Sequence, residues 1–293
     1  MDLKTYLKTT ADKVDLELDA VLPAADQRPS TLHQAMRHSM FAGGKRLRPV
    51  LCLAACEACG GIAEKALRPA AAIEMMHTYS LVHDDLPAMD DDDLRRGKPT
   101  CHVVYGEAIA ILAGDALLTQ AFTVMAGAPG SIGHPPLELV KELALAGDSI
   151  RLIGGQVLDL EGEGKSLSLD ELRTIHENKT GALLTAAIRC GAMSGNASPE
   201  QLEALTRFGK SLGLAFQVID DILDITQDST QLGKTAGKDL ESEKSTYPAL
   251  MGLDGAKAEA KRLTNEALAA LEVIGKPAAR LEEIARYMLE RPF

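Results

Sequence analysis

The sequence predicts an all-α fold, with residues 1–293 forming a single large helical bundle around a central cavity. Hydrophobic residues make up 46% of the chain but aromatic residues only 3%, and alanine and leucine, which favour helices, are abundant. Apolar residues recur at helical spacing in most segments. A length of 293 residues without repeats or low-complexity runs allows one large domain with a sizeable core.

Composition also restricts the partners and the compartment. The net charge of -11 disfavours nucleic acid and anionic membranes. Residues 1–15 are charged and amphipathic, unlike a signal peptide, and Glu107 and Asp115 interrupt the most apolar region before it reaches the length of about 18 residues that spans a membrane. The chain has five cysteines, and three of them, from Cys52 to Cys59, recur at helical spacing. We interpret these three as buried thiols and not as a metal site. We therefore expect a soluble protein of the reducing cytoplasm with no stable membrane anchor.

The first elements are helical. Residues 2–22 predict an amphipathic helix, and a second helix is expected from Thr31, as its N-cap, to Phe41, with the glycines of residues 43–44 ending it. Pro49 is favoured as the first residue of the next helix.

A basic turn, Lys45 to Arg48, lies between these helices. Its cations Lys45, Arg46 and Arg48 stand beside a helix N-terminus, which is a good receptor for a diphosphate group. A solvated basic turn is the alternative interpretation.

The helix expected over residues 70–84 is buried on most sides. Its polar residues Glu74, His77, Ser80 and Asp84 recur at three- and four-residue spacing, and nearly everything between them is apolar. We therefore expect this polar stripe to face an internal cavity. Taken alone, His77 also fits a core histidine with satisfied hydrogen bonds.

An acidic and then basic stretch follows at once. Its charged residues are Asp84, Asp85, Asp90, Asp91, Asp92, Asp93, Arg95, Arg96 and Lys98. Crowded carboxylates repel one another unless cations lie among them, and Mg²⁺, which binds carboxylates and substrate phosphates, is the natural cation. The arginines would hold phosphate oxygens. A solvated acidic loop is the alternative.

The middle of the chain predicts three more helices. Residues 105–125 form a central helix that is apolar nearly all round, and after the breakers of residues 127–136 a helix spans residues 137–160 with Gln156 and Asp159.

The third of these helices, capped by Ser168 or Asp170, carries Lys179 and Thr180 before Gly181. A glycine within a helix costs about 1 kcal/mol relative to alanine, and a local kink would turn backbone carbonyls toward the cavity. The alternative is a surface lysine beside a packing glycine.

A second acidic helix lies far away in the sequence. Gln217, Asp220, Asp221 and Asp224 share one of its faces, and apolar residues fill the others. Carboxylates on such a helix are costly to bury unpaired. We therefore expect the two acidic helices to face each other across one cavity and to share Mg²⁺ ions.

The chain after this helix is expected to be a lid and a scaffold. Lys234, Lys238 and Lys244 would close over a diphosphate or stay in a solvated loop. The helices of residues 247–289 are expected to be scaffold.

Five segments in this order resemble one family. They are GGKRLRP (residues 43–49), DDLPAMD (84–90), RRG (95–97), DDILD (220–224) and GKDLESEKSTYP (237–248). Together they resemble the trans-isoprenyl diphosphate synthases, and the spacing from Asp85 to Asp90 is similar to that of the bacterial type of farnesyl diphosphate synthase. The resemblance covers nearly the whole chain and implies a helical bundle of the isoprenoid synthase type.

The resemblance implies Mg²⁺-dependent head-to-tail prenyl transfer between isopentenyl diphosphate and an allylic diphosphate. About three Mg²⁺ ions, or Mn²⁺ in their place, would be held by Asp84, Asp85, Asp90, Asp220 and Asp224, with Asp221 in support. The diphosphates would be bound by Lys45, Arg48, His77, Arg95, Arg96, Lys179, Lys234 and Lys244, and Thr180 and Gln217 would lie near the allylic cation. It also implies a homodimer.

The product depends on the residues beneath the first aspartate. Tyr79 and Ser80 precede Asp84 by five and four residues, and in the family an aromatic residue here usually implies the fifteen-carbon farnesyl product. An ordinary core tyrosine is the alternative, and a geranylgeranyl diphosphate synthase, a terpene cyclase and a non-catalytic subunit of a prenyl synthase stay open. The end of the chain, Arg291, Pro292 and Phe293, departs from the basic ends of many relatives, which puts a role for the tail in doubt.

Overall fold

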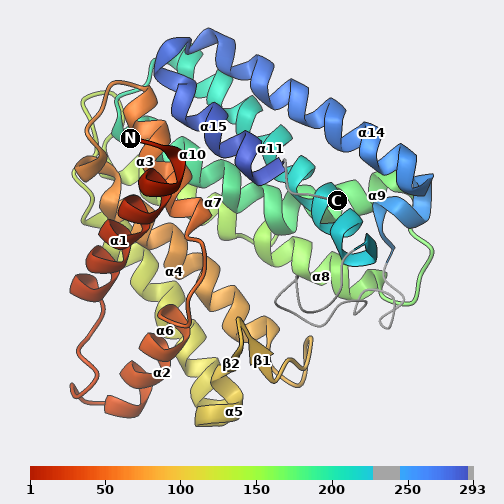
Figure 1. Cartoon of the computed structure of the whole chain (residues 1–293). Coiled ribbons are helices and arrows are strands. Elements are labelled where there is room, and N and C mark those ends of the chain that lie inside the picture. The colour runs from red at the N-terminus through yellow and green to blue at the C-terminus, as the bar shows by residue number, and fades with distance from the viewer. Residues whose placement is uncertain (227–244, 290–293) are drawn as a thin grey trace.

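The computed structural model describes residues 1–226 and 245–289, which fold almost entirely as helices (Figure 1). The helices are α1 (Leu3–Val21), α2 (Ser30–Met40), α3 (Leu47–Ala58), α4 (Leu67–Asp84), α5 (Cys101–Tyr105), α6 (Glu107–Ala126), α7 (Pro136–Gly147), α8 (Leu152–Gly162), α9 (Leu169–His176), α10 (Ala182–Ser194), α11 (Pro199–Thr226), α14 (Tyr247–Ala270) and α15 (Ala279–Leu289). Short 3₁₀ turns are η1 (Ala63–Ala66), η3 (Leu271–Val273) and η4 (Lys276–Ala278). The predicted all-α fold is confirmed.

A small hairpin is the exception to the helical fold. Strands β1 (Leu94–Arg95) and β2 (Lys98–Pro99) pair antiparallel, with Leu94 opposite Pro99. They form the one pair of strands in the described part of the chain. The hairpin follows the first run of aspartates and fixes the position of Arg95.

Helices α4 and α11 form the centre of the bundle. Helix α4 packs against α3, α6 and α10, while α11 packs against α10 and α14 (Figure 1). Each helix belongs to a large cluster of buried apolar side chains, with Met75 and Met76 in one and Phe208 and Leu212 in the other. Both acidic motifs lie at the C-terminal ends of these two well-packed helices.

The second and third helices begin earlier than the sequence predicts. Helix α2 begins at Ser30, so Thr31 lies inside it, and no side chain caps its N-terminus. Helix α3 begins at Leu47 instead of Pro49, because Arg46 adopts a left-handed backbone conformation (φ 50°) and forms the N-cap.

The central helix predicted over residues 105–125 is α6, which begins at Glu107 because Gly106, with φ 79°, separates it from α5. The next predicted helix, over residues 137–160, is interrupted. The carboxylate of Asp148 accepts hydrogen bonds from the backbone N–H groups of Ile150 (2.9 Å) and Arg151 (2.8 Å), so the chain turns between α7 and α8. The prediction of one continuous helix over residues 137–160 was wrong, because the apolar residues keep their helical spacing across the Asp148 cap and so give no sign of the break.

A π-turn, η2 (Glu177–Gly181), joins α9 to α10. Helix α9 starts with a capping box, in which Ser168 accepts from the Glu171 N–H and the Glu171 carboxylate accepts from the Ser168 N–H. Of the two predicted caps, Ser168 and Asp170, the structure therefore has Ser168. A π-turn widens a helix by one residue and is frequent at functional sites, so the local irregularity expected before Gly181 takes this form.

Helix α6 presents apolar side chains outside the core. Among the described helices, it is the one that is long and apolar enough to cross a membrane. In the structure, 39% of its most apolar 18-residue stretch is buried. Core helices of soluble proteins can have the same length and composition. Contrary to the expectation from sequence, Glu107 and Asp115 therefore do not make this helix too polar to span a membrane. Ile111 and Leu112 are 44% and 53% exposed.

Candidate active site

Two cavities beside α4 share Lys179 and Thr180 in their walls. The larger, of about 390 Å³, is mostly apolar and is lined by Arg48, His77, Tyr79, Ser80, Leu81, His83, Asp84, Met89, Leu152, Ile153, Gln156, Val157, Leu160, Lys179, Thr180 and Leu183. The second, of about 240 Å³, is polar and is lined by Asp90, Asp159, Gly162, Leu167, Leu172, Ile175, His176, Lys179, Thr180, Gln217, Asp221, Ser245 and Thr246. Carboxylates from both acidic motifs, Asp90 and Asp221, therefore face one pocket.

The polar stripe of α4 mostly faces the apolar cavity. His77, Ser80 and Asp84 line it, as their helical spacing predicts. Glu74 does not, because this side chain is buried and its carboxylate accepts a hydrogen bond from Arg46 Nη1 at 2.8 Å.

Asp84 ends α4 in a position that disfavours its charge. Burial, together with repulsion from Asp90 and Asp85, raises the pKa of Asp84 to about 6, although Lys179 acts to lower it. The negative end of the helix dipole also disfavours a carboxylate here. A bound cation would reverse these effects, so the position is suited to one.

Asp85 points to a different partner. It is 3% exposed, and both of its oxygens accept hydrogen bonds from Arg95 Nε, at 2.7 and 3.0 Å. Arg95 also lies 3.7 Å from Asp92. Asp85 therefore orients Arg95 on the hairpin, and a direct metal contact by Asp85 stays a prediction.

Arg48 and His77 line the apolar cavity near the basic turn. Burial lowers the pKa values of Arg48, His77 and Arg96, and the neighbouring arginines lower that of His77 further, well below its usual range. The Nε of Arg48 is buried without a hydrogen-bond partner. Lys45 is exposed on the same turn. This excess of positive charge is suited to an anion with several oxygens.

The glycines before the basic turn allow Arg96 to approach it. Gly44 has φ +123°, and a methyl group there would lie 2.4 Å from Nη1 of Arg96. Arg96 donates a hydrogen bond to the carbonyl of Gly43. The hairpin is thereby joined to the turn.

Arg46, which the sequence left unassigned, anchors the basic turn. It is 4% exposed and donates to Asp15 of α1 (2.8 Å), Glu74 of α4 (2.8 Å) and the Met40 carbonyl of α2 (2.7 Å). Arg46 thus fixes the turn to three helices.

The π-turn forms the opposite wall. Lys179 Nζ lies 2.7 Å from Asp159 Oδ2 of α8, and Thr180 follows it into both cavities. Gln217 of α11 lines the polar pocket. Nε2 of Gln156 is buried without a hydrogen-bond partner at the apolar cavity.

The second acidic motif lies along α11 near the start of α14. Asp221 is 6% exposed and accepts a hydrogen bond from the Tyr247 N–H at 3.0 Å. Asp224 is also 6% exposed. Charge attraction from Asp220 opposes the lowering of the pKa of Arg48 by burial, which links this motif to the basic turn.

His176 and Tyr247 were not among the predicted site residues. Their rings lie 5.6 Å apart, and His176 Nδ1 and the Tyr247 hydroxyl are both buried without a hydrogen-bond partner. Burial lowers the pKa of His176 to about 4, so the ring is neutral at pH 7. Only the position of His176, three residues before Lys179, could have drawn attention to it.

The donor set fits Mg²⁺ by its chemistry. Within residues 1–226 and 245–289, no three His, Cys, Asp or Glu side chains are already grouped closely enough to hold a metal ion. Carboxylates of both acidic motifs nevertheless line the polar pocket, and carboxylate oxygens are the ligands that Mg²⁺ prefers. The predicted Lys234, Lys238 and Lys244, and Arg291, Pro292 and Phe293, lie outside the described residues.

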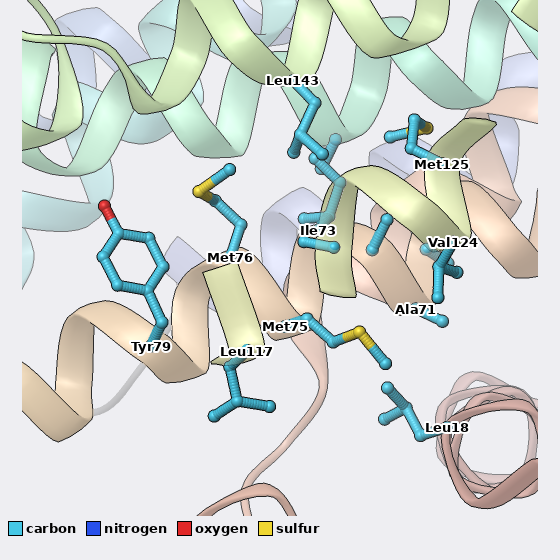
Figure 2. Close-up of a cluster of buried hydrophobic side chains, with 14 of the residues drawn as sticks. Leu18, Ala71, Ile73, Met75, Met76, Tyr79, Leu117, Val124, Met125 and Leu143 are labelled. Carbon is cyan, nitrogen blue, oxygen red and sulfur yellow. The ribbon is translucent and has the colours of Figure 1, made fainter. Parts of the chain in front are cut away.

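Tyr79 lies where the apolar cavity meets the core. Its side chain lines the cavity but is only 5% exposed, and burial raises the pKa of its hydroxyl, which has no hydrogen-bond partner, to about 12. Figure 2 shows Tyr79 and Met76 projecting from the same side of α4, with Leu143 beyond Met76. Met76 is completely buried. Ser80 donates its hydroxyl hydrogen to the His77 carbonyl at 2.9 Å.

The chain is similar to known proteins over most of its length. The polyprenyl synthetase family model matches residues 29–284. The heterodimeric geranylgeranyl pyrophosphate synthase large subunit 1 of Arabidopsis thaliana is 50% identical, with 91% of this chain and 73% of the relative covered. The geranylgeranyl pyrophosphate synthase of Catharanthus roseus is 48% identical, with 99% of this chain and 82% of the relative covered.

Solved structures agree with this result. A putative farnesyl-diphosphate synthase from Marinomonas sp. MED121 superposes with a TM-score of 0.85 at 42% identity, and the match covers 99% of each chain. An FPP/GFPP synthase from Zymomonas mobilis superposes with a TM-score of 0.87 at 36% identity over 98% of each chain. The chain belongs to the polyprenyl synthetase family and is a trans-isoprenyl diphosphate synthase in sequence and fold.

Proposed function

We propose that this prenyltransferase condenses isopentenyl diphosphate with dimethylallyl diphosphate and then with geranyl diphosphate, head to tail, to give (2E,6E)-farnesyl diphosphate. The observation that carries the proposal is the apolar cavity of about 390 Å³, which shares Lys179 and Thr180 with a pocket lined by acidic residues of both motifs. A hydrocarbon tail fits the first cavity, and a diphosphate with its metal ions fits the second.

The residues of this chain bind and orient the two diphosphates. Lys45, Arg48, neutral His77 and Arg96 hold isopentenyl diphosphate at the basic turn, where positive charge exceeds negative charge. Arg95 and Lys179 hold the allylic diphosphate on the other side.

Asp84, Asp85, Asp90, Asp220 and Asp224 would hold Mg²⁺, or Mn²⁺ in its place, which would supply positive charge to the leaving diphosphate. Thr180 and Gln217 place oxygen atoms beside the allylic cation. The double bond of isopentenyl diphosphate attacks that cation, a new carbon–carbon bond forms, and the released diphosphate takes the proton. The apolar walls exclude water, which would otherwise convert the cation to an alcohol.

Tyr79 supports the fifteen-carbon product. Its Cα lies about 7.5 Å along α4 from that of Asp84, at about 1.5 Å per residue. Its ring lies at the boundary between the cavity and the packed core, where it would stop a growing chain.

A second candidate product is geranylgeranyl diphosphate. Most of the similar curated proteins carry that name, including those of Arabidopsis thaliana and Catharanthus roseus. The two candidates share one mechanism and differ only in the depth available to the chain.

Product analysis separates them. Purified protein is incubated with Mg²⁺, isopentenyl diphosphate and dimethylallyl or geranyl diphosphate, and the alcohols released by hydrolysis are sized. We expect farnesol from the native protein and from Tyr79→Phe, which keeps the ring, and longer alcohols from Tyr79→Ala. Geranylgeraniol from the native protein would favour the second candidate, while an unchanged distribution in Tyr79→Ala would place the floor elsewhere.

A second copy of this chain is the proposed macromolecular partner. The exposed apolar side chains of α5 and α6, among them Val103, Val104, Ile111 and Leu112, support a homodimer. Analytical ultracentrifugation at micromolar concentration tests this, and a monomer there would refute it.

A further inference from the structure

Helices α8 and α11 each pack closely against the π-turn at a glycine. A methyl group on Gly155 would lie 2.3 Å from the backbone nitrogen of Lys179 and 2.7 Å from its Cα. A methyl group on Gly213 would lie 2.9 Å from Cα of Gly181. Since ordinary contacts of a Cβ atom begin at 3.4 Å, neither position has room for a larger residue.

Local preference does not account for these two glycines. Both lie inside α-helices, where glycine costs about 1 kcal/mol relative to alanine. Neither has the positive φ that only glycine adopts readily. The close approach of another backbone is what their missing side chains permit.

The turn that they contact carries site residues. Lys179 and Thr180 line both cavities, and the ammonium group of Lys179 is held 2.7 Å from Asp159, four residues after Gly155 on the same helix. Helix α8 therefore fixes Lys179 twice, through the backbone at Gly155 and through the side chain at Asp159.

We propose that Gly155 and Gly213 are positioning residues, which let α8 and α11 hold the π-turn at the depth where Lys179 and Thr180 meet the substrate. The kinetic part of this inference rests on the proposed function, whereas the placement of the turn does not.

Alanine substitutions at three glycines test this proposal, because it predicts which variant loses most kcat and which loses least. Gly155→Ala must separate α8 from the turn by about 1 Å, and a displacement of about 1 Å at a reacting centre costs on the order of 100-fold in rate. We expect a fall in kcat of that order. Gly213→Ala should lose less, because its methyl group is less crowded. Gly181→Ala should lose least, because a methyl group there meets only the His176 carbonyl oxygen, at 3.5 Å.

The KM for isopentenyl diphosphate distinguishes positioning from general damage. It should stay unchanged in Gly155→Ala, since the basic turn lies on a different wall. The matched control is Gly255→Ala on α14, whose methyl group would meet the flexible side chain of Met251 at 3.3 Å. This control should keep native kcat and KM.

Hydrogen exchange provides a readout without substrate or metal. In the free protein, peptides covering residues 176–182 should exchange faster in Gly155→Ala than in the native protein, and the control should not differ. Native kcat together with native exchange in Gly155→Ala would overturn the proposal, as would a loss explained entirely by a smaller folded fraction. If the native protein elongates no substrate, the proposed function fails, and the exchange comparison still decides the placement of the turn.

Discussion

Replacing Asp84 with asparagine should make the metal-free protein more stable while removing its activity. The pKa of this carboxyl is raised from 3.8 to about 6, mainly by burial, with Asp90 and Asp85 adding repulsion. Between these two pH values the folded protein binds more protons than the unfolded chain, so the free energy of unfolding falls as pH rises. Well above pH 6 the carboxyl is ionised in both states, and the free energy of unfolding is lowered by the whole amount that corresponds to the pKa shift.

The magnitude follows from the size of the pKa shift. A shift of about 2 units at about 1.4 kcal/mol per unit corresponds to about 3 kcal/mol at neutral pH. Asparagine has nearly the same shape but no charge, so Asp84→Asn should gain about this amount. At pH 5 the native carboxyl is largely protonated, and the same relation leaves a difference of about half that size.

Urea unfolding in EDTA measures this difference at pH 7.5 and pH 5. The matched control is Asp91→Asn, an exposed aspartate in the same loop, whose left-handed backbone (φ 50°) asparagine accommodates. That control should leave stability unchanged at both pH values. Added Mg²⁺ should stabilise the native protein more than Asp84→Asn, because only the native site keeps the full ligand set. A variant that is no more stable than the native protein at pH 7.5, or a gain independent of pH, would refute the reasoning.

Two further substitutions test the two sides of the site. Glu74→Ala should lower the free energy of unfolding in urea by roughly 3–5 kcal/mol, because the Arg46 cation stays buried at 4% exposure after losing its buried partner. The double variant Arg46→Met with Glu74→Leu should recover much of this loss. If the effects of the single variants simply add in the double variant, the reasoning is wrong. Asp220→Ala should lower turnover by several orders of magnitude with an unchanged circular dichroism spectrum, since no core volume is lost, and near-native activity at saturating Mg²⁺ would rule out its metal role.

Helical period and charge pattern were sufficient to predict the main features. The stripe from His77 to Asp84 faces a cavity because residues three and four apart share a helix face. The two acidic motifs meet at one pocket, as the cost of burying unpaired carboxylates requires. These predictions succeed because each depends on local geometry together with one general rule of solvation.

Other features depend on contacts that local sequence does not encode. Arg46 bonds to Asp15 and Glu74, which are 31 and 28 residues away in the chain, and nothing near Arg46 indicates this pairing. The break at Asp148 comes from a side-chain cap within an unbroken apolar pattern. The hydrogen bond from Arg95 to Asp85 forms because a tight hairpin returns the arginine to the end of α4, and nothing in the acidic run indicates this pairing.

The position of the acidic motifs shows how the fold prepares the site. Asp84 lies at the negative end of the α4 dipole, and Asp85, Asp221 and Asp224 are nearly buried. In a protein selected for stability alone, apolar or basic residues would be favoured at these positions. The extensive apolar packing of α4 and α11 holds the carboxylates in place despite their repulsion. Such a local conflict, maintained by strong packing elsewhere, is typical of functional sites and supports the proposal that metal ions bind here.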